Sequence, residues 1–255
     1  MTPDQNTHPV RRRRSPLARL FIRCTVAEVE PVTRSTRRVR LVADALRELA
    51  WTPGQQIRLH VHDLFALQTW LRGPKDALRT YSVWEHDPVA GAVELRLHDH
   101  GGDGPGVGWA RRAVPGQAVT LTGPEGDFVL RPAPYYVFAG EETATVAIGA
   151  MVRALAPGLP VYGVLESETA GDELPIPARA GLRRVHRNGA PAAASPTLLA
   201  ALRDLDLPDE PGAAYLAGEA RTCQLLRDHL VRGLGWPRDA VKVKPFWAPG
   251  KRGMD

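Results

Sequence analysis

The chain has 255 residues, 44% of them hydrophobic, which is enough to bury the core of one large domain or of two small ones. It carries 33 Lys and Arg against 28 Asp and Glu, and four of the arginines are clustered at residues 11–14, so the remainder is nearly neutral. Its two cysteines, Cys24 and Cys223, are too few and too far apart for a disulfide scaffold, a thiolate zinc site or a cysteine-ligated iron–sulfur cluster within the chain.

The arginine cluster lies between Pro9 and Pro16. Such a run is compatible with an arm that binds nucleic acid or a membrane surface, but it is more often a solubilising tail, and we favour a disordered basic tail over residues 1–18. A twin-arginine export signal needs an uninterrupted apolar segment after the arginines, whereas charged residues interrupt residues 19–30. No apolar stretch approaches the ~20 residues that span a bilayer. We therefore expect a cytoplasmic protein that neither binds nucleic acid nor inserts into a membrane.

Residues 19–132 have the pattern of an antiparallel barrel. Short segments in which polar and apolar residues alternate recur at fairly regular spacing, with Pro-Gly and Gly-Pro pairs between them. This pattern predicts a closed Greek-key β-barrel. The expected strands are 21–26, 38–42, 56–61, 80–84, 92–97 and 118–121.

Residues 133–255 change to alternating strands and helices, which predicts an α/β domain. A continuous apolar run over 135–140 ends at Gly140 and indicates a buried parallel strand, and a helix over 143–155 follows it. An open parallel sheet of this kind binds ligands at the carboxyl ends of its strands. The remaining expected strands are 161–165, 183–186, 213–217 and 241–247, and the remaining helices are 197–205 and 221–234.

The first candidate motif is Arg79-Thr80-Tyr81-Ser82 on a strand of the barrel. Because alternate residues of a strand face the same side, Arg79 and Tyr81 project together. A guanidinium beside a phenol ring suits a phosphate and the ring of a flat ligand. A cross-strand surface pair explains the same pattern equally well.

The second motif is the glycine-rich segment 100–112, which leads into a short helix. Its glycines leave backbone N–H groups unobstructed, and the start of the helix favours an anion. A flexible hairpin loop is the simpler alternative. Because the segment follows the Arg79 strand, however, a pyrophosphate cradle is the better interpretation.

Two histidine pairs also stand out, His60 with His62 and His98 with His100. Each pair places two imidazoles on one face of a strand, as a metal site would require. Neither pair has a third ligand nearby, so we expect histidines on the strand surface and no metal site.

Two turns of the second domain share a strand–Gly–Glu–helix pattern. They are Gly140-Glu141-Glu142-Thr143-Ala144, after the first strand, and Gly218-Glu219, after a later one. Glutamate suits the first turn of a helix through the helix dipole, and Thr143 offers a hydroxyl to a nicotinamide or a phosphate. Helix capping alone accounts for each turn, but two such turns in one sheet define a ligand crevice better than one does.

Taken together, the motifs resemble those of the siderophore-interacting protein family, and their order matches over nearly the whole chain beyond the tail. They are segments 79–82, the loop 100–110, Gly123-Pro124, segment 140–144, His186-Arg187-x-Gly189, segment 217–220 and Phe246-Trp247 before Gly250. Four positions depart from the usual family pattern: Glu141 replaces Asp, Gly106-Val107 replaces Ala-Ser, and Phe246 replaces Tyr.

The resemblance implies two cofactors. The first is a non-covalent FAD, with one of the closing aromatic residues, Phe246 or Trp247, near its ring. The other residues that would contact the FAD are Arg79, Thr80, Tyr81, Ser82, His98, His100, Gly104, Pro105, Gly106, Val107, Gly108 and Trp109. The second is NADPH or NADH, which the resemblance places at Gly140, Glu141, Glu142, Thr143, Ala144, Gly218 and Glu219. Hydride transfer needs proximity and alignment rather than an acid or base, so the resemblance assigns no catalytic side chain.

In the family, electrons pass through the flavin to Fe(III) in a siderophore, and Fe(II) is released because hard oxygen ligands hold it less tightly. Many ferric siderophores are anionic, so a group of basic residues could form an electropositive mouth that attracts them. Ordinary solvated surface charges are an equally good interpretation of the same residues. These are Lys75, Arg79, Arg111, Arg112, Lys242, Lys244, Lys251 and Arg252.

Other functions are compatible with the same sequence. One is a related FAD and NAD(P)H oxidoreductase that acts on an organic substrate in a biosynthetic pathway. Another is a flavin- or siderophore-binding module without turnover. A ferredoxin is an alternative electron donor, and we expect a monomer.

Overall fold

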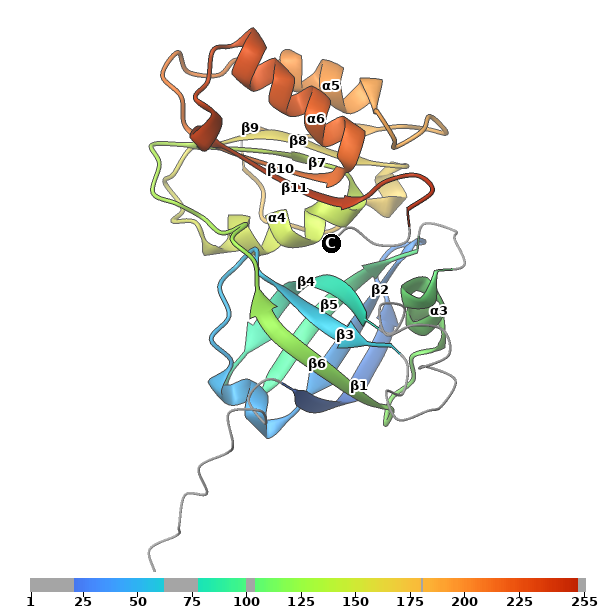
Figure 1. Cartoon of the computed structure of the whole chain (residues 1–255). Helices are drawn as coiled ribbons and strands as arrows, with labels where there is room; N and C mark the ends of the chain where they lie inside the picture. Colours follow the sequence, from blue (N-terminus) through green and yellow to red (C-terminus); the bar gives the residue numbers. More distant parts are fainter. Residues whose placement is uncertain (1–20, 62–77, 100–103, 180, 252–255) are drawn as a thin grey trace, which may run out of the picture.

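The computed structural model describes residues 21–61, 78–99, 104–179 and 181–251, which form two domains packed on each other (Figure 1). The expected tail, His62 and His100 lie outside the described residues. No helix in the described part of the chain is long and apolar enough to cross a membrane.

The N-terminal domain is a closed antiparallel barrel with the strand order β1-β2-β5-β4-β3-β6. Strands β3, β4 and β5 are antiparallel neighbours in sequence, and β2 pairs with β5, which is Greek-key connectivity. Alternate side chains point inward, and Val26, Leu41, Leu59 and Leu95 are fully buried. The elements are β1 (Ile22–Pro31), β2 (Thr36–Val42), the 3-10 turn Asp44–Glu48, β3 (Gln56–His60), β4 (Leu78–Asp87), β5 (Ala92–His98), α3 (Pro105–Arg112) and β6 (Ala118–Glu125).

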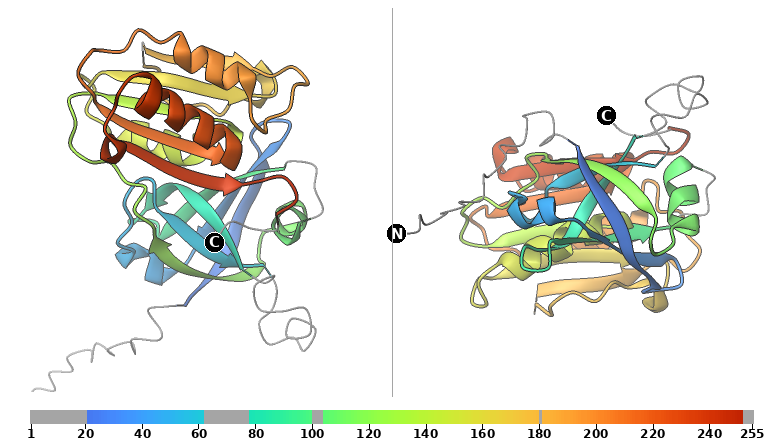
Figure 2. Two further views of the ribbon diagram at one scale, coloured as in Figure 1. Left: turned by 45° about the horizontal axis from the view of Figure 1, so that its top comes forward. Right: turned by 90° about the horizontal axis from the view of Figure 1, so that it is seen from below.

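The second domain is a five-stranded parallel sheet with the order β11-β10-β7-β8-β9. Helix α4 lies on the face toward the barrel, and α5 and α6 cover the other face (Figures 1 and 2). The expected fold class, a barrel followed by a parallel α/β domain, is confirmed. The elements are β7 (Tyr136–Gly140), α4 (Glu142–Ala154), β8 (Val161–Ser167), the 3-10 turn Ala170–Asp172, β9 (Gly181–His186), α5 (Pro196–Arg203), β10 (Ala213–Glu219), α6 (Ala220–Asp228), the π turn His229–Gly233, the 3-10 turn Arg238–Ala240 and β11 (Val241–Trp247).

The position of the site follows from this strand order. From β7 the chain moves to β8 on one side, and it later returns to β10 on the other side. The carboxyl ends of β7 and β10 are therefore neighbours, with α4 and α6 leaving toward opposite faces. Open α/β sheets bind ligands at such a switch point.

Candidate functional site

Helix α3 begins beside the strand that carries Arg79 and Tyr81. A Cβ added at Gly106 would lie 2.6 Å from the Tyr81 hydroxyl oxygen and 3.2 Å from Arg79 Cγ, so the helix packs on the face where both side chains project. The prediction that these two residues share a face is confirmed. Among the described residues no side chain caps the start of α3, where Gly104 is the N-cap and the first turn has no acidic residue.

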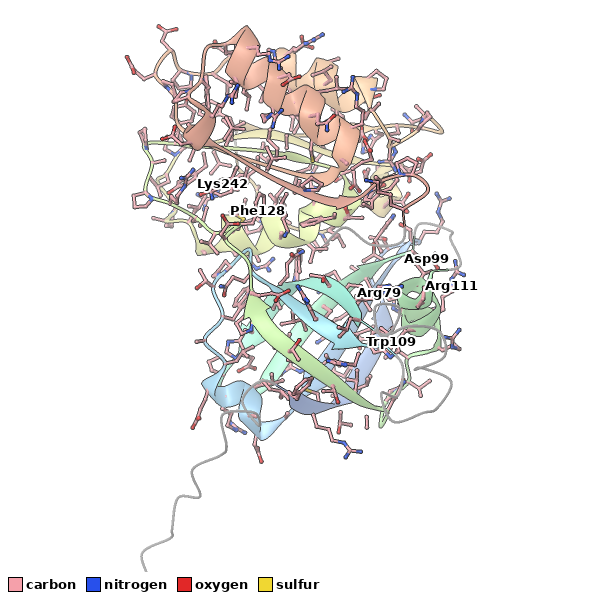
Figure 3. All side chains as sticks on the ribbon, in the orientation of Figure 1. Arg79, Asp99, Trp109, Arg111, Phe128 and Lys242 are labelled. Atoms are coloured by element: carbon pink, nitrogen blue, oxygen red, sulfur yellow. The ribbon has the colours of Figure 1, made fainter. Side chains whose placement is uncertain are left out.

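The other residues of the barrel motifs lie in different surroundings. On the opposite face of β4, Thr80 is exposed and Ser82 is buried, so that face is open at Thr80 and covered at Ser82. Trp109 is only 4% exposed, and its ring packs in the barrel core. Trp109 therefore anchors α3 to the barrel from inside, and Figure 3 shows it beneath Arg111. A ligand at this loop would contact the backbone at the start of α3 rather than the Trp109 ring.

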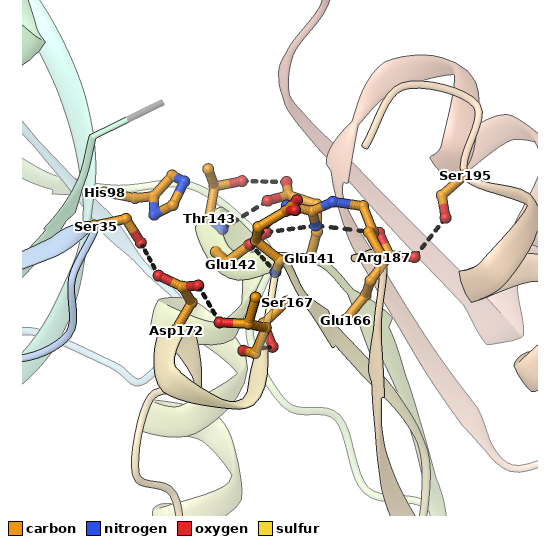
Figure 4. Close-up of polar contacts among 12 residues, drawn as sticks. Ser35, His98, Glu141, Glu142, Thr143, Glu166, Ser167, Asp172, Arg187 and Ser195 are labelled. Atoms are coloured by element: carbon orange, nitrogen blue, oxygen red, sulfur yellow. Dashed lines mark hydrogen bonds and ion pairs between the residues drawn. The ribbon is translucent and has the colours of Figure 1, made fainter. Parts of the chain in front are cut away.

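The expectation that the histidines lie on the strand surface is wrong for His60. Its side chain is buried, because β3 is covered at four of its five positions, and burial lowers the pKa of His60. His98 ends β5, with Nδ1 3.4 Å from Thr36 Oγ1, on the side of the barrel that faces the second domain (Figure 4). The described part of the chain contains no group of three or more His, Cys, Asp or Glu residues that could hold a metal ion.

The two strand–Gly–Glu–helix turns of the second domain are in contact. A Cβ added at Gly218 would lie 2.5 Å from Glu141 Oε1, and a Cβ added at Gly140 would overlap Ala144 and lie 2.5 Å from the Ala217 carbonyl oxygen. Glycine is needed at both positions for the ends of β7 and β10 to approach this closely. The sequence motifs thus meet at one place, as the crevice hypothesis requires.

Both helices that start at this crevice are capped by glutamates of the chain itself. Glu141 accepts the Thr143 N–H at 2.8 Å and the Thr143 hydroxyl at 2.5 Å. Glu219 accepts the N–H groups of Arg221 at 2.9 Å and of Thr222 at 2.7 Å. The hydroxyl of Thr143 therefore serves Glu141 in this structure. The starts of α4 and α6 therefore each hold a carboxyl group, whereas the described residues place none in the first turn of α3.

A buried cluster around Arg187 was not anticipated from the sequence (Figure 4). Arg187 is 7% exposed at its side chain, and its guanidinium donates to Glu142 at 2.7 and 2.8 Å and to Glu166 at 3.2 Å. Glu166 also accepts the hydroxyl of Ser195. The only sequence signal was Arg187 itself, within the motif His186-Arg187-x-Gly189, because its partners come from α4 and β8.

The two adjacent glutamates at the start of α4 have opposite pKa shifts. Burial, and then the charge of Glu142, raise the pKa of Glu141 to about 7. Burial alone would also raise the pKa of Glu142, but the hydrogen bonds and charge of Arg187 hold it below its usual value. Glu141 therefore titrates near neutral pH, while Glu142 stays ionised.

The basic residues proposed for one electropositive mouth are divided between two sides of the molecule. Arg79 and Arg111 lie near α3, and Arg111 forms an ion pair with Asp99 at 2.7 Å. Lys242 lies at the start of β11, away from them, and pairs with Asp127 at 2.7 Å (Figure 3). Lys75 and Arg252 lie outside the described residues.

Comparison with known proteins assigns both domains. One family model, described as the siderophore-interacting FAD-binding domain, matches residues 25–128, and a second, described as siderophore-interacting protein, matches residues 133–250. The chain belongs to the siderophore-interacting protein family. Its N-terminal barrel is thereby an FAD-binding domain by family, and the resemblance inferred from the motifs is confirmed.

Among family relatives, the ferric vibriobactin reductase ViuB of Vibrio cholerae is 29% identical over 182 residues, which cover 69% of this chain and 66% of that reductase. The crystal structure of a siderophore utilization protein from T. fusca superposes with a TM-score of 0.78 and 26% identity, covering 92% of this chain and 95% of that one. Phthalate dioxygenase reductase shares the fold, with a TM-score of 0.66 and 19% identity over 91% of this chain and 70% of its own.

Proposed function

We propose that this protein is a cytoplasmic FAD-dependent reductase that takes electrons from NADPH or NADH and passes them to Fe(III) in a siderophore. The observation that carries the proposal is the contrast among the three helix N-termini near the domain junction. Those of α4 and α6 are capped by Glu141 and Glu219, whereas the first turn of α3 carries no acidic residue and lies beside Arg79.

The residues around α3 fit the diphosphate and ring of FAD. The backbone N–H groups of its first turn are donors for an anion, and the guanidinium of Arg79 adds a positive charge beside them. Tyr81 supplies an aromatic surface on the same side of β4. FAD, when bound, accepts a hydride and gives up electrons singly. The residues of this chain would hold it there and orient its ring toward the second domain.

The crevice between β7 and β10 fits the nicotinamide end of the electron donor. Gly140 and Gly218 let the carboxyl ends of β7 and β10 approach closely, and a nicotinamide would bind over this edge of the sheet. The phosphates of the dinucleotide would bind elsewhere along this edge of the sheet, because the starts of α4 and α6 are capped by carboxylates.

An anaerobic absorbance experiment tests the proposal. Purified protein is loaded with FAD, then mixed with NADPH or NADH, and finally with a ferric siderophore and a ferrous-iron trap. Flavin bands that bleach with the nucleotide and recover as trapped Fe(II) appears are the expected result.

Each other outcome supports a different function. Bleaching without recovery on any ferric substrate would favour an organic acceptor in a biosynthetic pathway. Bleaching by reduced ferredoxin but by neither nucleotide would assign the donor to a protein. A protein that binds no flavin would contradict the proposal.

A further inference from the structure

The last strand of the sheet, β11, ends at a tryptophan whose side chain is hydrogen-bonded to the residue that follows the first strand of the domain, β7. The Trp247 indole Nε1–H donates to Glu141 Oε1 at 3.0 Å. Strand β11 is at the edge of the sheet, and its pairing with β10 shifts register between Gly218 and Glu219, which places Trp247 opposite Glu219. The hydrogen bond therefore reaches past the end of β10 to join the ends of β11 and β7.

The carboxyl of Glu141 is held rigidly. It is 2% exposed, one oxygen accepts the Thr143 N–H at 2.8 Å, and the other accepts the Thr143 hydroxyl at 2.5 Å together with the Trp247 indole. Gly218, with φ +117°, lies against this carboxyl, and a side chain there would displace it. Three donors and a glycine thus fix a single carboxyl group.

We infer that Glu141 is a positioning residue whose carboxyl holds the Trp247 indole at the mouth of the crevice between β7 and β10. The consequence for catalysis rests on the proposed function: a ring held there competes with the nicotinamide for the same place. The hold itself does not depend on that function, because it is a property of the folded chain.

The strength of the hold depends on the charge of Glu141. A hydrogen bond to a carboxylate is roughly twice as strong as one to a neutral group, so ionised Glu141 holds the indole more firmly. Burial, and then the charge of Glu142, raise the pKa of Glu141 to about 7. The other charged or titratable groups near this carboxyl are Glu142 on α4 with its partners Arg187 and His98, Cys223 on α6, and Glu219 at the end of β10.

Of the three glutamates at this place, Glu141 is the one whose pKa is raised to about 7. Arg187 keeps Glu142 ionised, and the backbone N–H groups at the start of α6 hold the pKa of Glu219 below its usual value despite its burial. Burial, with the charges of Glu141 and Glu219, raises the pKa of the Cys223 thiol to about 12. The indole of Trp247 should therefore respond to the titration of Glu141, the group to which it donates.

Nuclear magnetic resonance of the nitrogen-15-labelled full chain tests the hold directly. The Trp247 indole N–H resonance, assigned by its loss in Trp247→Phe, should shift with pH around a midpoint of about 7. In Glu141→Gln the same resonance should stay constant between about pH 5 and about pH 9. The control is Trp236→Phe, which removes the ring of a tryptophan buried in the core on the far face of the sheet and should leave the titration intact.

A Trp247 resonance that does not titrate in the unmodified protein, or that titrates equally in Glu141→Gln, would overturn the inference.

An enzymatic measurement tests the consequence for catalysis. Glu141→Gln and Trp247→Phe should each lower the KM for the nicotinamide nucleotide about threefold, and the double variant should lower it no further. An inactive unmodified enzyme would refute the proposed function, while the resonance would still decide the inference.

Discussion

Glu141 and Glu142 are adjacent and both buried, yet they respond differently because their partners differ. Glu141 receives its hydrogen bonds from neutral donors, the hydroxyl and N–H of Thr143 and the indole of Trp247. Glu142 receives two from the guanidinium of Arg187, at 2.7 and 2.8 Å. At Glu141 the neutral donors do not offset the burial of the charge, whereas at Glu142 the bidentate guanidinium does.

The raised pKa of Glu141 predicts a pH-dependent stability difference. Folded Glu141 binds its proton more tightly than unfolded Glu141, so its contribution to stability is present below pH 4.5 and is lost as pH rises to about 7. The free energy of unfolding of Glu141→Gln minus that of the unmodified protein should therefore rise by roughly 1 to 3 kcal/mol from pH 5 to pH 8. Urea unfolding at the two pH values measures this, and an equal difference at both would contradict it.

The cluster around Arg187 predicts the opposite pH dependence. Arg187→Met leaves Glu142 and Glu166 buried without their cation, which should cost about 3 to 5 kcal/mol of unfolding free energy at pH 8. Because the lowered pKa of Glu142 stabilises the fold only where Glu142 is ionised, the loss should shrink as pH falls toward 4. Urea titrations across this range measure the loss.

Arg183→Met is the matched control, since Arg183 is exposed on β9, the strand that Arg187 directly follows, and it should cost less than about 0.5 kcal/mol. A similar loss for both arginines would show that the buried cluster does not stabilise the fold.

At the scale of elements, α3 differs from α4 and α6 in that none of the described side chains caps its start. Two of its glycines allow the packing of α3 to be tested separately from its helix propensity. Gly106→Ala places a Cβ 2.6 Å from the Tyr81 hydroxyl, so α3 must move off β4, and FAD affinity should fall about tenfold. Gly108→Ala meets only the flexible end of Arg112, at 3.1 Å, and should leave FAD affinity within about twofold. Flavin fluorescence titration measures both affinities. Equal affinities for the two variants would show that α3 is not part of the flavin site.

Most elements could be predicted from the sequence because their signals are local. The alternation of the barrel strands, the apolar run of β7 and the helix expected over 143–155, observed as Glu142–Ala154, all depend on neighbouring residues. The helix expected over 221–234 is shorter, since α6 ends at Asp228 and a π turn continues to Gly233.

The Arg187 cluster could not be predicted, because it depends on strand order. Glu142, Glu166 and Arg187 are far apart in sequence, and only the neighbouring parallel strands β7, β8 and β9 bring them together. The burial of His60 likewise follows from the closure of the barrel rather than from the alternation of β3. For the same reason the hydrogen bond from Trp247 to Glu141 has no signal in either segment alone.

At the scale of the whole molecule, one aromatic side chain joins the two domains. Two guanidiniums contact the ring of Trp84 on β4, that of Arg153 of α4 at 4.0 Å and that of Arg96 of β5 at 5.2 Å from the ring centre. Its other contacts include Val146 of α4 and Leu174, in a small apolar cluster. A second contact joins Ser35 of the barrel to Asp172 at 2.9 Å. These contacts set the distance between the start of α3 and the crevice of the sheet.

Gly149 of α4 tests whether this junction matters. Replacing a helical glycine by alanine normally gains about 1 kcal/mol, but a Cβ at Gly149 would lie 2.7 Å from the Trp84 ring and 2.8 Å from Ile176. Because the Trp84 ring is buried and contacts two guanidiniums, we expect α4 to shift instead. Gly149→Ala should then destabilise the protein by about 1 to 3 kcal/mol and separate one calorimetric transition into two.

The same displacement should slow flavin bleaching by NADPH, because electron transfer needs the two domains to be correctly aligned. FAD should still bind, because the FAD site lies on the barrel alone in the proposed function. Gly158→Ala, at a position with no neighbour within 4 Å, is the matched control and should change neither property. If Gly149→Ala unfolds in one transition and bleaches at the rate of the unmodified protein, the junction at Trp84 does not set the geometry between flavin and nucleotide. The crevice of the sheet would then have to be aligned with the barrel by the contact between Ser35 and Asp172.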